Sequence, residues 1–278
     1  LSQDLNRQRQ IYTDAVQAID RGHWTEYAQL RSGLDDYPLA IYLDFFQLIG
    51  QLDKVQPAEA QRFLSRSADT PLPNRFLSVY LREAGKAQRW QDFLQVMAKE
   101  PNSVALKCYY FRAQLAQGNK EVAWEGARRL WMQGDSLPGE CAPLFDLWQS
   151  SGGLTDDIVW TRLLNSFAAR QRSLLQFAAK KSSAQLAPWT EKLLAVYDRP
   201  ESLPKLALPA DSPYSADIAS HGLTYLASYS PQEALSYWTD VRQRLHFTAE
   251  QVRSVEYAIA QQSLFSRTEE HREWLEGA

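Results

Sequence analysis

The sequence has few of the residues that form turns, metal sites and reactive thiols. Its 278 residues include 12 Gly, 4 His, 2 Met and 2 Cys. A sheet-rich domain of this size commonly spends more glycine on its turns, so the scarcity favours helices. The four histidines do not stand at metal-ligand spacing from one another or from a cysteine, and no base accompanies either cysteine. We therefore expect neither a metal site nor a catalytic cysteine. The histidines are His23, His221, His246 and His271.

Long apolar runs, concentrated positive charge and phosphate-binding loops are also missing. No run approaches the roughly 20 apolar residues that cross a bilayer, so we expect no membrane span. The net charge of −3 argues against nucleic acid as a partner. The glycines in "GKAQRW" and "GNKEVAW" stand at helix bends and form no phosphate cradle, so we expect no cofactor. The chain begins with Leu1 rather than Met, which suggests a processed or trimmed N-terminus.

A succession of short helices fills most of the chain. Apolar residues recur at helical spacing over roughly 10–17 residues, and Gly, Pro or Asn separate the segments. Residues 5–21 form one helix, which Gly22 ends, and residues 223–245 read as a hairpin that bends at Ser230 and Pro231. Residues 249–275 form a long final helix without a polar cap. Because stacked repeats need capped ends, we expect the natural protein to continue beyond it.

A repeat runs through the middle of the chain. Gly85 and Gly118 are 33 residues apart, and each is expected to close one helix and precede a second. Periods near 34 residues made of two helices are typical of tetratricopeptide-like αα-hairpins, which bury their apolar faces by stacking. The sequence therefore predicts an all-α fold, a superhelical stack of αα-hairpins over residues 1–278. At the same offset Trp90, Leu94 and Met97 recur as Ala123, Ala127 and Leu130.

Residues 198–215 depart from this pattern. The stretch holds four prolines and little periodicity. We interpret it as an irregular connection between two groups of hairpins within one domain. A true domain boundary remains the alternative.

Two acidic pairs and a set of aromatic residues need a choice between structure and chemistry. Asp35 with Asp36, and Asp156 with Asp157, stand where helices are expected to begin, so capping is the preferred interpretation.

Aromatic residues at helical spacing could form a sugar platform, but packing is the commoner role. We therefore expect most of these aromatic residues to lie in the core. They are Tyr109, Tyr110, Trp124, Trp131, Trp148 and Trp160.

The two cysteines, Cys108 and Cys141, are separated by 33 residues, the same interval as the repeat. Equivalent positions on successive hairpins bring side chains close, since packed helices lie 8–10 Å apart. A disulfide between them would indicate an oxidising compartment. Two buried thiols remain the alternative.

Two stretches resemble the N-terminal helical domain of soluble lytic murein transglycosylases of Gram-negative bacteria. The first is "GLDDYPLAIYLDF" at residues 33–45, and the second runs from Cys108 through "AWEGARRLWMQG" and "PGECAPLFDLW". Beyond Gly152 the resemblance rests on pattern and order. The first motif is carried by Asp36, Tyr37, Pro38, Leu39, Tyr42 and Leu43. The second is carried by Cys108, Ala123, Trp124, Gly126, Ala127, Leu130, Trp131, Gly134, Pro138, Cys141, Phe145, Trp148, Ser151 and Gly152.

The resemblance implies a periplasmic protein acting on peptidoglycan (murein). Such enzymes cleave the glycan strand without water and leave a 1,6-anhydromuramic product. Their N-terminal helices form a U-shaped superhelix, and a separate lysozyme-like domain carries one catalytic Glu. That Glu precedes Ser, with Gly-Leu-Met-Gln later. Here Glu201-Ser202 precedes Leu203, and Gly222-Leu223 precedes Thr224, so neither half of the motif is complete.

We therefore expect the catalytic domain to be absent from this chain and the chain to hold no catalytic residue. Its expected role is to frame the C-terminal catalytic domain of the same protein and to contact peptidoglycan. The alternative is a periplasmic tetratricopeptide-like scaffold that binds a protein or peptide partner.

Overall fold

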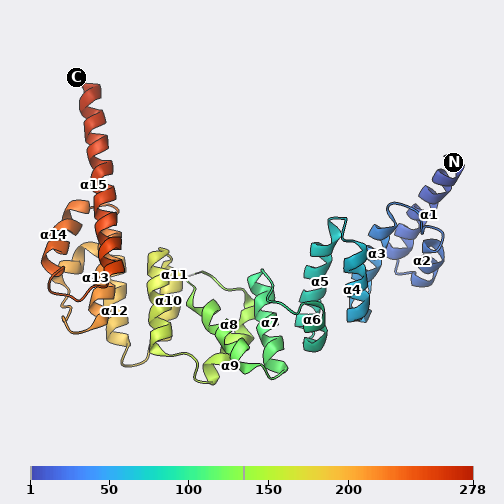
Figure 1. Cartoon of the computed structure of the whole chain (residues 1–278), viewed down its shortest axis with the longest axis horizontal. Helices are drawn as coiled ribbons and strands as arrows, with labels where there is room; N and C mark the ends of the chain where they lie inside the picture. The colour runs from blue at the N-terminus through green and yellow to red at the C-terminus, as the bar shows by residue number, and fades with distance from the viewer. Residues whose placement is uncertain (1, 134, 278) are drawn as a thin grey trace. The chain divides into compact units, whose positions relative to one another are not determined.

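The computed structural model describes residues 2–133 and 135–277, so Gly134 of the second motif lies outside it. Within these residues the chain is helical and holds no strand (Figure 1). The predicted all-α class is confirmed. The chain divides into two compact units, Leu1–Ala127 with Leu137–Trp148, and Arg128–Ser136 with Gln149–Ala278.

The first unit is built from short helices that pack on their neighbours along the chain. Helix α1 packs on α2 and α3, α5 contacts α3, α4, α6 and α7, and α7 contacts η2. The elements are α1 (Ser2–Asp20), α2 (Trp24–Arg31), α3 (Ala40–Gly50), η1 (Leu52–Lys54), α4 (Pro57–Arg66), α5 (Leu72–Lys86), α6 (Trp90–Val96), α7 (Val104–Ala116) and η2 (Gly139–Cys141). The division between the units falls within α8 (Lys120–Met132) and α9 (Ala142–Ser150).

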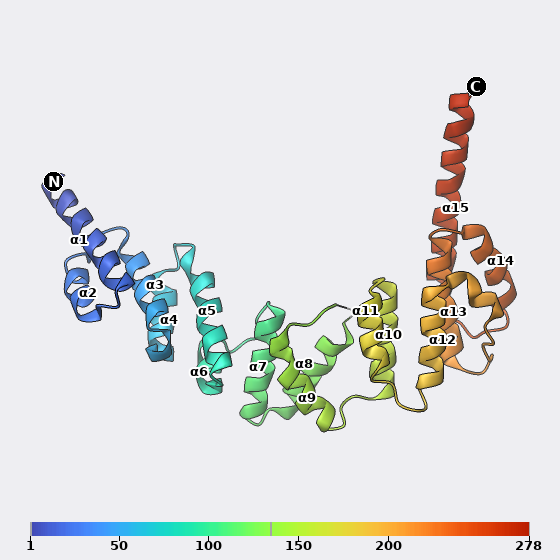
Figure 2. The ribbon, with the colours of Figure 1, turned by 180° about the vertical axis from the view of Figure 1, so that it is seen from behind.

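The second unit is organised around α13, which contacts α10, α12, α14 and α15. Figure 2 shows α13 beside α12 and α15, with the later turns of α15 running past α14. The predicted hairpin is confirmed, but its first helix begins at Pro213 rather than at residue 223, and its bend is Ser228–Ser230, with Pro231 already in α14. The elements are α10 (Asp156–Ala168), α11 (Arg172–Ala179), α12 (Ala187–Asp198), η3 (Pro200–Lys205), α13 (Pro213–Ala227), α14 (Pro231–Val241) and α15 (Ala249–Gly277).

Residues 198–215 are more regular than the sequence suggests. They contain the 3₁₀ helix η3, whose Leu203 is fully buried and which packs on α12 and α13. The residues on both sides belong to the second unit. The stretch is therefore part of that unit's packing, while its place in the domain organisation of the protein stays a prediction.

One turn recurs at four places in the described residues. A residue with positive φ follows the first helix, and the next residue donates its backbone N–H to a carbonyl five positions earlier, the Schellman arrangement. Between α5 and α6, for example, Arg89 N–H donates to the Ala84 carbonyl at 2.8 Å. The second helix begins two residues after the positive-φ residue in each case. These residues are Gly22 (φ 70), Gln88 (φ 59), Gly118 (φ 89) and Arg170 (φ 58).

Each of these turns places one side chain of the second helix in the core. The residue five positions after the positive-φ residue is at most 1% exposed at all four places. Because the turn fixes where the second helix starts, it also fixes which of its residues faces the first helix. These buried residues are Tyr27, Phe93, Ala123 and Leu175.

The predicted register of the repeat is wrong by three residues. The turn between α5 and α6 is made by Gln88, not by Gly85, so successive turns are 30 residues apart, from Gln88 to Gly118. Consequently Phe93, rather than Trp90, occupies the place of Ala123. The predicted pairs of Leu94 with Ala127 and of Met97 with Leu130 are three residues out of register for the same reason.

Gly85 serves a close approach between helices instead. It is buried in the last turn of α5, and a Cβ atom there would lie 2.4 Å from Cγ of the Tyr109 ring on α7. The missing side chain lets that ring lie against the α5 backbone. Gly85 is therefore a packing residue of the α5–α7 contact.

We expect Gly85→Ala to lower the free energy of unfolding by about 1–3 kcal/mol, because the added methyl group overpacks the contact with Tyr109. Gly139→Ala is the matched control, since no atom lies within 4 Å of a Cβ at that position. Urea denaturation followed by circular dichroism measures both. An equal effect of the two substitutions would contradict the close-packing role.

Candidate functional site

The two cysteines form a buried disulfide. Cys108 on α7 and Cys141 in η2 are joined, with their Cα atoms 5.0 Å apart and both side chains fully buried. The predicted pairing is confirmed, and the alternative of two buried thiols is wrong. No free cysteine remains in the described chain.

The acidic pairs differ in their outcome. Helix α3 begins at Ala40, and Asp35 instead forms an ion pair with Arg31 at 3.1 Å, so the prediction that Asp35 and Asp36 cap this helix is wrong. Asp156 and Asp157 do lie in the first turn of α10, as predicted. There their negative charge is favoured by the exposed N–H groups of the helix start.

The aromatic residues singled out from the sequence belong mainly to the core. Five of the six are at most 9% exposed, and the sixth, Trp124, is half-buried. The interpretation as packing residues is confirmed. The five are Tyr109, Tyr110, Trp131, Trp148 and Trp160.

The histidines are dispersed over the structure. His23 is exposed and lies 3.4 Å from a carboxylate oxygen of Glu26. His221 is inside the second unit, where burial lowers the pKa of its imidazole. The side chain of His271 lies outside the described residues. Among the described residues, no three or more His, Cys, Asp or Glu side chains gather in a way that could hold a metal ion.

None of the helices described here combines the length and the apolar character needed to cross a membrane.

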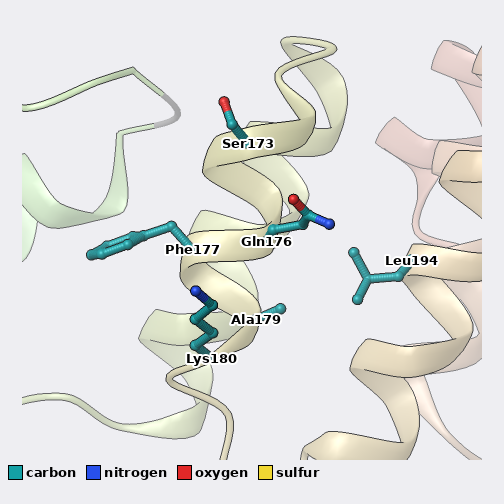
Figure 3. A pocket seen from close by; sticks show the side chains of 6 residues that line it. All are labelled: Ser173, Gln176, Phe177, Ala179, Lys180 and Leu194. Carbon is teal, nitrogen blue, oxygen red and sulfur yellow. The ribbon is translucent and has the colours of Figure 1, made fainter.

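A groove of about 520 Å³ lies along α11 and reaches α12 (Figure 3). In Figure 3 the Gln176 side chain points towards Leu194, and Phe177 points away from it. An ion pair joins the same two helices, since the Arg172 guanidinium donates to both oxygens of Asp198 at 2.8 and 3.0 Å. The groove thus offers mixed polar and apolar groups on fixed helices. It is lined by Ser173, Gln176, Phe177, Ala179, Lys180 and Leu194.

A buried guanidinium packs against the Phe177 ring. Arg162 on α10 is 2% exposed, with its guanidinium carbon 4.6 Å from the Trp131 ring centroid and 5.0 Å from that of Phe177. Its Nε and Nη1 atoms have no hydrogen-bond partner among the described residues. Burial lowers the pKa of Arg162 to about 10, so the side chain still carries its charge at neutral pH. The two rings hold this cation in place of a carboxylate.

In the same unit, three tyrosines form what we call the tyrosine cluster, Tyr197, Tyr225 and Tyr229. The Tyr225 ring lies between the other two, with centroids 5.6 Å from Tyr197 and 6.1 Å from Tyr229. The guanidinium carbon of Arg170 lies 3.9 Å above the Tyr225 ring centroid. Tyr229 is 54% exposed, and its hydroxyl donates to Glu201 Oε2 at 3.0 Å.

Glu201 is the glutamate of the Glu-Ser pair that partly matches the motif described in the sequence. Its carboxylate accepts hydrogen bonds from its own backbone N–H and from the Tyr229 hydroxyl, and these lower its pKa. A general acid needs a carboxyl that stays protonated near neutral pH, which requires a raised pKa. The environment of Glu201 therefore suits a hydrogen-bond acceptor.

The tyrosine cluster was not singled out from the sequence. Tyr225 and Tyr229 are four residues apart, which places them on one side of a helix, and this was the available signal. Tyr197 and Glu201 come from α12 and η3. Their approach depends on how these elements fold back on α13.

The known proteins to which the chain is similar in sequence share one name, soluble lytic murein transglycosylase. Soluble lytic murein transglycosylase from Escherichia coli strain K12 is 22% identical over 276 residues, which cover 99% of this chain and 43% of that protein. The protein of the same name from Salmonella typhimurium is 34% identical over 149 residues, covering 53% of this chain and 23% of that protein. No protein-family model matches.

A solved structure agrees with these relatives. The crystal structure of an inactive mutant of lytic transglycosylase Slt from Pseudomonas aeruginosa matches 91% of this chain and 41% of that one, with a TM-score of 0.78 and 30% identity. The resemblance to soluble lytic murein transglycosylases is confirmed. The chain spans less than half the length of the curated relatives it matches.

We expect Arg162→Met to leave the urea midpoint unchanged or to raise it. The substitution keeps an apolar stem between Trp131 and Phe177 and removes a buried charge that has no carboxylate partner among the described residues. Arg162→Ala, in contrast, loses the packing as well and is expected to lower stability by about 1–2 kcal/mol. Equal destabilisation by both substitutions would mean that the charge itself stabilises the fold.

Titration of the unreduced, denatured protein should detect no free thiol, and titration after reduction should detect two. The double substitution of Cys108 and Cys141 by Ala is expected to cost about 3–4 kcal/mol, because the bond closes a loop of 33 residues in the unfolded chain. Urea denaturation measures this loss. Two free thiols before reduction would contradict the disulfide.

Proposed function

We propose that this chain is a non-catalytic helical domain of a periplasmic lytic transglycosylase, the domain that frames a catalytic domain and contacts peptidoglycan. The observation that carries the proposal is the similarity to soluble lytic murein transglycosylases along 99% of the chain. In this proposal residues 1–278 form one helical domain, with residues 198–215 as a connection inside it. The lysozyme-like catalytic domain lies outside these residues.

The disulfide supports the compartment. Bonds of this kind form and persist in oxidising surroundings such as the bacterial periplasm, and they are rare in the cytosol. The bond between Cys108 and Cys141 is buried, so it is shielded from thiols in solution. A buried disulfide of this kind is expected in a periplasmic protein. The relatives are named for their action on murein, which is peptidoglycan.

The electrostatics of Glu201 support the absence of catalysis. Cleavage of a glycosidic bond needs a group that can protonate the leaving oxygen. The Glu-Ser pair in this chain presents an exposed carboxylate whose pKa is lowered, in a 3₁₀ helix rather than in an enclosed cleft. In this proposal the chemistry of the parent enzyme belongs to another part of that protein.

The chain alone, incubated with purified peptidoglycan sacculi, should bind the sacculi and release no anhydromuropeptides. Co-sedimentation measures binding, and mass spectrometry of the supernatant measures release. The Glu201→Gln variant is the internal control, since it should behave as the parent in the release assay. Release of anhydromuropeptides by the parent chain would disprove the catalytically empty domain. Failure to sediment with sacculi would favour the scaffold that binds a protein or peptide.

A further inference from the structure

Tyr229 is an aromatic side chain that is exposed and nevertheless held in place. It follows α13, and 54% of its surface is open to solvent. The hydrogen bond to Glu201 fixes the hydroxyl end, and a perpendicular contact with Tyr225 fixes the ring. An exposed side chain ordinarily keeps rotamer freedom and loses it when a ligand binds. Tyr229 has lost much of that freedom before any ligand arrives, so its open face is preorganised.

The side chains behind Tyr229 form a rigid base. Phe167 is fully buried, and its ring centroid lies 5.1 Å from that of Tyr197 and 6.1 Å from that of Tyr225. Arg170 covers the Tyr225 ring and donates Nη1–H to the Phe167 carbonyl at 2.9 Å. The inner positions are filled, so the outermost ring stays at the surface.

The polar groups at the edge of the ring have capacity to spare. A carboxylate has about four acceptor positions, and Glu201 uses one for the Tyr229 hydroxyl and one for its own backbone N–H. Partial burial and the hydrogen bond to Glu201 together raise the pKa of the Tyr229 phenol to about 12. The pair therefore keeps its neutral hydroxyl and ionised carboxylate throughout the physiological range.

A sugar ring matches this combination. A pyranose has C–H groups on one face, which pack against an aromatic ring, and hydroxyl or amide groups on its perimeter, which exchange hydrogen bonds with carboxylates and guanidinium groups. The spare acceptor positions of the Glu201 carboxylate suit the hydroxyl donors of a sugar, whereas a nucleic-acid phosphate at the same place would meet a like charge. Tyrosine is also among the side chains that commonly carry most of a binding energy.

We infer that Tyr229, with Glu201 at its edge, is a contact surface for the sugar rings of a glycan strand. The inference rests on the proposed function, contact with peptidoglycan, and it names the glycan rather than the peptide stem as the ligand of this surface. Tyr225 and Tyr197 support the surface from within.

The test uses glycan strands from which the peptides have been removed with an amidase, and intact sacculi in parallel. Tyr229→Ala should weaken binding to the peptide-free strands by about ten-fold or more, as for a central aromatic contact. Tyr229→Phe should weaken it less, because the ring remains but is no longer fixed by Glu201. Tyr257→Ala is the matched control, since Tyr257 is 67% exposed on α15 and lies outside the cluster. It should bind like the parent chain.

Two results would overturn the inference while leaving the proposed function intact. One is binding to sacculi that disappears when the peptides are removed, which would assign recognition to the stems. The other is a Tyr229→Ala variant that binds peptide-free strands as well as the Tyr257→Ala variant does. A chain that does not bind intact sacculi would contradict the proposed function itself. Circular dichroism and the urea midpoint establish that each variant is folded.

Discussion

The fold depends on one local constraint, the turn that reverses the chain between paired helices. A positive-φ residue and a backbone hydrogen bond spanning five positions end the first helix, and the second helix then starts two residues later. This spacing delivers a fully buried side chain, such as Phe93 or Leu175, against the preceding helix. A short helix has little stability alone in water, so tertiary packing at this point decides whether it forms. The turns therefore determine which side chains pack between paired helices, and the groove and the tyrosine cluster lie on helices positioned by that packing.

The helices could be predicted because their periodicity and their proline and glycine breaks are local properties. The register of the repeat could not, because two of the four turns use non-glycine residues. Gln88 and Arg170 adopt a conformation that favours glycine, at a cost that the surrounding packing offsets. Gly85, three residues before Gln88, looked like the turn residue. Its actual role, admitting the Tyr109 ring, depends on a neighbouring helix and leaves no local signal.

The candidate site shows the same division between local and distant information. Cys108 and Cys141 could be paired from the sequence because they are 33 residues apart, about the length of one hairpin. Residues separated by one hairpin lie on helices that pack against each other. The tyrosine cluster could be found only in part. Tyr225 and Tyr229 are four residues apart in the sequence, but the carboxylate that fixes Tyr229 comes from η3, within the stretch expected to be irregular. The order of that stretch is a consequence of packing on α12 and α13.

Glu201 connects the two questions that the sequence raised, catalysis and sugar binding. A carboxyl cannot serve equally well as a general acid and as the ionised partner of a phenol, because the first role needs a raised pKa and the second lowers it. Exposure and the Tyr229 hydroxyl both favour the ionised form. The backbone N–H of Glu201 and the Tyr229 hydroxyl together make Glu201 unsuitable as an acid, and the bond from the hydroxyl also fixes an exposed ring at the surface. The same contact therefore argues against chemistry at this position and for binding there.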